Sequence, residues 1–99
     1  MPQRVFSKIY LHITWHSKNN EPLITEEILK LLNSIIRGKC NANREVIFIS
    51  MGGVQDHVHL ALKVPPTLHI ARWIGELKGV TSHETKEVTS LKHFTWQEG

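Results

Sequence analysis

The residues from His57 to Val64 alternate strictly between apolar side chains and others, and this pattern constrains the fold more than any other feature. The apolar row comprises Val58, Leu60, Leu62 and Val64. Successive side chains of a β-strand point to opposite faces, so this row must face a core while the intervening residues face outward. The sequence therefore predicts a half-buried strand in a sheet with one covered and one open face.

A second alternating segment runs from Val5 to Trp15 and predicts another half-buried strand. Its apolar side carries Val5, Ile9, Leu11, Ile13 and Trp15. Its other side carries Phe6, Lys8, Tyr10, His12, Thr14 and His16. The polar run from Lys18 to Pro22 then predicts a loop.

Residues between the two alternating segments show helical spacing. Thr25 is suited to cap a helix, and Glu26 and Glu27 suit its positive end. The apolar face consists of Ile28, Leu31, Leu32, Ile35 and Ile36. Gly38 and the run from Asn41 to Asn43 indicate where this helix ends.

Arg44 to Met51 is rich in β-branched residues and predicts a further strand, with Gly52-Gly53 as the turn or bulge before His57. Pro65-Pro66 should end the alternating strand, and Thr67 should cap a second helix. The apolar stripe of this helix consists of Leu68, Ile70, Trp73, Ile74 and Leu77. From Thr81 to Gly99 the pattern weakens, which predicts a loop-rich tail with a short helix near Glu84.

The order strand, helix, strand, strand, helix predicts a single α+β domain over residues 1–99. It matches the ferredoxin-like, split βαβ plan, an antiparallel sheet with two helices on one face. In that plan the first strand lies beside the third. A final strand should pair with the other edge of the first, but His93 to Trp96 is too short to supply it convincingly. Without that strand the first one is a bare edge.

Composition is that of an ordinary soluble chain and narrows the function only slightly. The net charge of +3 favours a polyanionic partner, although it also serves solubility alone. Cys40 is the only cysteine, so no internal disulfide forms, and we expect an idle, buried thiol in a reducing compartment. No apolar run approaches the roughly 20 residues of a membrane span, and Met1 to Arg4 does not resemble a secretory signal. We expect a cytoplasmic protein.

His57 and His59 are the candidate ligands of a metal ion. Both lie on the open face of the predicted strand, roughly 6.5–7 Å apart, where one ion can contact both. Such a pair also arises by chance in a chain with seven histidines. If the first strand lies alongside, however, its outward side brings Tyr10, His12 and His16 to the same face, which packing alone does not explain.

Four segments resemble the single-strand tyrosine transposases of small bacterial insertion sequences, which belong to the HUH endonucleases. They are IYLHITWHSKNNEPLI, ISMGGVQDHVHLALKVPP, IARWIGELKGVTS and FTWQEG, and the histidine-hydrophobic-histidine motif is the most specific. The resemblance implies that His57 and His59 hold Mg²⁺ or Mn²⁺ against the scissile phosphate of single-stranded or hairpin DNA. It also implies a homodimer, in which a tyrosine of one subunit meets the histidines of the other.

The chain departs from this family at the nucleophile. The family's tyrosine follows the Trp-Gln motif, and the only tyrosine here, Tyr10, is not at a matching position. We therefore expect a C-terminally truncated copy that lacks the final strand and the tyrosine helix. It should bind metal weakly and DNA hairpins poorly, and it should not cut.

Several side chains are candidates for contacts with DNA, although each basic one is individually better explained as a solvated surface group. The candidates are Lys8, Tyr10, Lys63, Arg72 and Lys78, with Lys86 and Lys92 as weaker ones. Phe6 and Tyr10 could stack bases, but packing is the preferred interpretation for Phe6.

Two alternatives remain from the sequence. HVHLAL also resembles the histidine-triad nucleotide hydrolases, but Ala61 replaces their third histidine. The second alternative is a non-catalytic ferredoxin-like module that binds nucleic acid and in which the histidines have no role.

Overall fold

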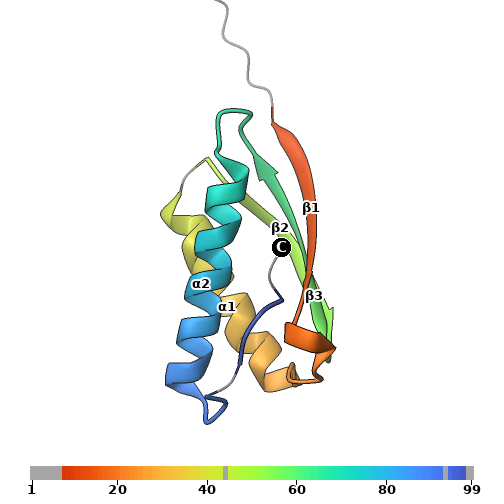
Figure 1. Cartoon of the computed structure of the whole chain (residues 1–99). Helices are drawn as coiled ribbons and strands as arrows, with labels where there is room; N and C mark the ends of the chain where they lie inside the picture. The colour runs from red at the N-terminus through yellow and green to blue at the C-terminus, as the bar shows by residue number, and fades with distance from the viewer. Residues whose placement is uncertain (1–7, 44, 93, 98–99) are drawn as a thin grey trace, which may run out of the picture.

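A computed structural model describes residues 8–43, 45–92 and 94–97 and shows an α+β fold, as predicted (Figure 1). Its elements are β1 (Ile9–His16), a 3-10 turn (Lys18–Asn20), α1 (Glu26–Ala42), β2 (Ile47–Val54), β3 (His57–Val64) and α2 (Ile70–Val88). The antiparallel sheet has the order β1-β3-β2, so the first strand does lie beside the third. Both helices cover one face of the sheet, which leaves the other face open (Figure 1).

β3 is the central strand and contributes the middle of the core. Its four alternate apolar residues, Val58, Leu60, Leu62 and Val64, are each 0% exposed. The helices cover this row with apolar residues of their own, chiefly Leu32, Ile36, Trp73 and Leu77. The period-two prediction for this strand is confirmed.

α1 begins and ends where the sequence predicts. The Thr25 hydroxyl accepts a hydrogen bond from the backbone N–H of Ile28 at 3.2 Å, which caps the helix. Cys40 faces the core near its end and is 2% exposed. Burial raises the pKa of the Cys40 thiol to about 11, against a small opposing effect of the Lys39 charge. The thiol is therefore buried and protonated at neutral pH, as expected.

The prediction that Gly52-Gly53 forms a turn or bulge is wrong. Both glycines lie inside β2, and the turn is formed by Gln55 and Asp56. The bulge occurs earlier, at the register shift between Phe48 and Ser50. At Gly52 the absent Cβ instead leaves room for a side chain from β3.

α2 is longer than predicted, because the tail after Thr81 continues the helix to Val88. Its N-cap is His69 rather than Thr67, and the His69 ring accepts the N–H of Arg72 at 3.2 Å. The buried stripe runs through Trp73, Leu77, Thr81 and Thr85. A threonine can occupy such a stripe when its hydroxyl bonds to the preceding helical turn, and Thr81 does so to Leu77 at 2.8 Å.

The segment after α2 returns to the sheet beside the end of β1. Phe94 is 0% exposed and Trp96 5%, and Trp96 forms an isolated antiparallel bridge with Ser17. The backbone carbonyl of His16 accepts the N–H of Gln97 at 2.8 Å. The segment predicted to be too short for a final strand therefore contributes one bridge, and His93 lies outside the described residues. Across the described part of the chain, no strand pairs with the outer edge of β1 from Ile9 to Trp15.

We predict that Thr81→Val destabilises the protein by about 1–3 kcal/mol, because it removes the acceptor of the Trp96 indole N–H and leaves that donor buried and unpaired. The bond is 2.9 Å long. The matched control is Thr85→Val, since the Thr85 hydroxyl is buried without a hydrogen-bond partner among the described residues. This change should be neutral or stabilising. Urea denaturation of both variants measures the difference, and equal costs would contradict the assigned bond.

Candidate metal and nucleic-acid site

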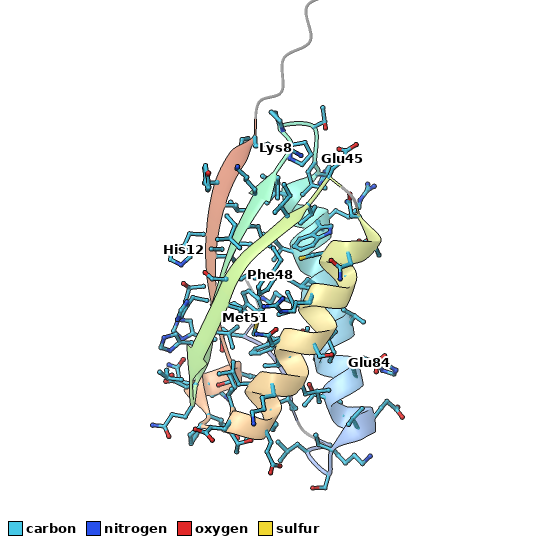
Figure 2. The ribbon with its side chains drawn as sticks, turned by 180° about the vertical axis from the view of Figure 1, so that it is seen from behind. Lys8, His12, Glu45, Phe48, Met51 and Glu84 are labelled. Carbon is cyan, nitrogen blue, oxygen red and sulfur yellow. The ribbon has the colours of Figure 1, made fainter. Side chains whose placement is uncertain are left out.

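The antiparallel pairing of β1 with β3 gathers histidines on the open face of the sheet. His16 pairs with His57, and Thr14 pairs with His59. His12 pairs with Ala61, two residues further along each strand and on the same face of the sheet. The His16 and His57 ring centroids are 5.2 Å apart, and those of His12 and His59 are 6.1 Å apart. Figure 2 shows His12 on the side of the sheet away from the helices. The predicted gathering of histidines on one face is confirmed.

His57 is oriented by the acid that precedes it. Its Nδ1 lies 2.9 Å from Oδ1 of Asp56, and both side chains are partly exposed. A carboxylate only accepts hydrogen bonds, so Nδ1 carries the proton and the lone pair of the neutral ring lies on Nε2. The Asp56 carbonyl in turn accepts the Ser17 N–H at 2.9 Å, which ties the turn to the end of β1. The arrangement leaves the lone pair of Nε2 available to coordinate a metal ion.

His59 is held against the backbone of the neighbouring strand. It pairs with Gly52 in the register of β2 and β3. A Cβ atom at Gly52 would lie 2.8 Å from Cε1 and 3.0 Å from Nε2 of the His59 ring. The imidazole therefore occupies the space that any other residue at position 52 would fill.

The chemistry of these donors fits a divalent ion that tolerates nitrogen ligands. Two oriented imidazoles can supply two ligands, and they suit Mn²⁺ better than Mg²⁺, which prefers oxygen. Across the described ranges, no three His, Cys, Asp or Glu side chains are grouped so as to hold a metal ion. An ion here would need its other ligands from water or from a bound phosphate.

The candidate DNA contacts divide between the two faces of the molecule. Tyr10 and Lys63 are paired on the open face, with Lys63 Nζ 5.0 Å from the centroid of the exposed Tyr10 ring. Lys8 is exposed just before β1 and donates to the Glu45 carbonyl at 2.9 Å. Arg72 and Lys78 lie on α2, in the helical layer, and Lys78 donates to the Gln97 carbonyl at 2.8 Å. Tyr10 and Lys63 thus share the histidine face, whereas the residues on α2 do not. Phe6 lies outside the described residues.

Sequence reasoning missed how Gly52 and Asp56 position the histidines. If the turn is placed at residues 55 and 56, Val54 pairs with His57, and two residues further from the turn Gly52 pairs with His59. Assigning the turn to the glycines hid that relation.

We predict that Gly52→Ala displaces the His59 ring, because the added methyl group would overlap it. The measurement is the NMR shift of the His59 ring protons, which should change while those of His69, the N-cap of α2, do not. Gly38→Ala is the matched control, since a Cβ there meets nothing within 4 Å. An unchanged His59 signal in Gly52→Ala would contradict the packing described here.

The comparisons with known proteins agree with the fold. The model of the family described as "Transposase IS200 like" matches residues 5–99. Seven solved chains match; one is a protein of Deinococcus radiodurans R1 provisionally described as a transposase, with a TM-score of 0.87, 21% identity and coverage of 100% of this chain and 80% of that one. No curated protein matches. Within the described residues no helix is long and apolar enough to cross a membrane. Since the family model spans nearly the whole sequence, the chain belongs to the IS200-like transposase family.

Proposed function

We propose that this transposase-family chain binds single-stranded or hairpin DNA on the open face of its sheet, through a divalent ion held by His57 and His59. The observation that supports it most directly is the placement of the two rings, with His57 hydrogen-bonded to Asp56 and His59 packed over Gly52. Rings that served only as surface groups would not need such constraints, because a free side chain keeps more conformational entropy.

The residues around the histidines have separate roles in this proposal. Bound to both rings, Mn²⁺ or Mg²⁺ would supply Lewis-acid polarisation of a phosphate oxygen. The exposed ring of Tyr10 offers a surface on which an unpaired base can stack, and Lys63 places a positive charge beside it. Lys8, Arg72 and Lys78 add sequence-independent attraction for phosphates further from the ion.

We further propose that these 99 residues do not cleave DNA by themselves. Tyr10 is the only tyrosine of the sequence. It lies four positions along β1 from Thr14, the residue paired with His59. At about 3.3 Å per residue, Tyr10 is roughly 13 Å along the strand from the level of His59 and roughly 20 Å from that of His57. That separation leaves its hydroxyl away from a phosphate bound at the ion. The homodimer implied by the family resemblance is also part of the proposal, and light scattering on the purified chain tests it.

We predict that His57→Ala and His59→Ala each weaken the Mn²⁺-dependent binding of a single-stranded oligonucleotide by about tenfold or more, as loss of a ligand should. His83→Ala is the matched control, because His83 is exposed on α2, away from the site. Fluorescence anisotropy with and without Mn²⁺ measures the effect. Binding that does not respond to Mn²⁺, or that survives both ligand changes, would overturn the metal site.

We predict that a labelled single strand incubated with the chain and Mn²⁺ stays intact. The absence of a covalent protein–DNA band on a denaturing gel is the expected result. A band would contradict the proposed inactivity. Its loss in Tyr10→Phe would then identify Tyr10 as the nucleophile.

A further inference from the structure

A groove lies between α1 and β2, on the opposite side of the sheet from the histidines. It has a volume of about 460 Å³ and is lined by Leu29, Lys30, Asn33, Ser34, Arg37 and Met51. Figure 2 shows Phe48 and Met51 on the α1 side of β2, with His12 on the other side. Two of the six lining residues are cations and none is acidic, so the groove favours an anionic occupant.

Arg37 is held in place with most of its donors unused. Its Nε donates to Oδ1 of Asn33 at 2.7 Å, and its guanidinium carbon lies 4.3 Å from the centroid of the Phe48 ring. These two contacts fix the plane of the guanidinium group. Among the described residues no carboxylate pairs with Arg37. Its terminal amino groups therefore form a fork with a set direction, which suits bidentate recognition of phosphate or of a base edge.

The rest of the groove matches a nucleotide in chemistry. Lys30 lies on α1 seven residues before Arg37, so the two cations share a face of the helix, about 10 Å apart along it. Asn33 and Ser34 between them offer hydrogen-bonding groups. Leu29 and Met51 are partly buried and supply an apolar surface. A positively charged groove that follows the phosphate backbone is a general feature of proteins that hold unpaired nucleic acid.

The groove is connected to the histidine face by the edge strand. Met51 pairs with the buried Leu60 and faces the groove, whereas the next residue, Gly52, pairs with His59 on the open face. In the described part of the chain, β2 is an edge of the sheet. A strand of DNA that leaves the histidines can therefore pass around β2 and enter the groove without crossing another element.

We propose that this groove is a second contact site for single-stranded DNA, in which Arg37 and Lys30 bind phosphates and one base lies against Leu29 and Met51. The inference rests on the proposed function, since the same DNA strand would occupy both sites. An acidic peptide is the competing occupant. The apolar floor and the transposase family favour DNA.

The experiment is an NMR titration of the ¹⁵N-labelled full chain with a ten-nucleotide oligothymidylate, together with anisotropy at several salt concentrations. We expect the Arg37 Nε–H signal and the amides from Lys30 to Arg37 to shift. Arg37→Gln should lower the affinity about tenfold and reduce the salt slope by about 0.7, the value for one phosphate contact in a single strand. Lys30→Gln should reduce the slope similarly. Lys30 is exposed and forms no ion pair among the described residues, so its effect is not one of misfolding.

Two variants separate charge from geometry. Arg37→Lys keeps the charge but lacks the stacked fork, so it should lose most of the affinity with little change in slope. Lys39→Gln removes one charge from α1 whose ammonium already pairs with Glu76 of α2 at 3.3 Å, so it should leave the affinity within about twofold.

The outcomes distinguish this inference from the proposed function. DNA binding that leaves the Arg37 and Lys30 signals unmoved and is unchanged in Arg37→Gln overturns the groove site alone. Groove binding that persists while the effect of Mn²⁺ is absent overturns the metal site alone. No binding of the oligonucleotide overturns both. Groove signals that shift with an oligoglutamate peptide but not with DNA also overturn the assignment.

Discussion

The alternation of side chains along β3 is the constraint on which the rest of the structure depends. This strand pairs with both others, and its four inward residues are fully buried. A slip of one residue in either pairing would turn His57 and His59 into the core and expose the apolar row. Desolvating two imidazoles and losing that burial would both be costly, so the register is strongly specified. The position of the histidines on the open face thus follows from the stability of the core.

Much of the fold could be predicted because burial and local periodicity coincide. β1, β3 and α1 bury one repeating side each, and the Thr25 cap is a local contact. α2 was predicted too short because Thr81 and Thr85 occupy core positions that a hydrophobicity pattern does not assign to them. Thr81 is tolerated there because its hydroxyl bonds both the helix and the Trp96 indole, a residue 15 positions away. A long-range bond of that kind leaves no local signal.

The candidate site likewise has one part that local periodicity predicts and another that depends on long-range structure. Alternation alone places His57 and His59, and the strand order adds His12 and His16. The details that orient the rings depend on register, which the turn at Gln55 and Asp56 sets. Gly-Gly is a strong turn signal on its own, but here the glycine at position 52 leaves the space that the His59 ring occupies. The Gly-Gly pair was predicted to form a turn, whereas Gly52 lies inside β2 beside the His59 ring.

The bulge in β2 explains how one edge strand serves both faces. In a regular strand, residues three apart point to opposite faces. The register shift between Phe48 and Ser50 changes this, so that Phe48 and Met51 pair with Leu62 and Leu60 and both face α1. Phe48 can then support Arg37 while Met51 lines the groove. The strand regains its normal alternation at Gly52, which faces His59. Bulges often re-aim side chains beside functional sites. Removing this one would turn Phe48 away from Arg37 or Gly52 away from His59, so both proposed contacts with DNA depend on the same extra residue.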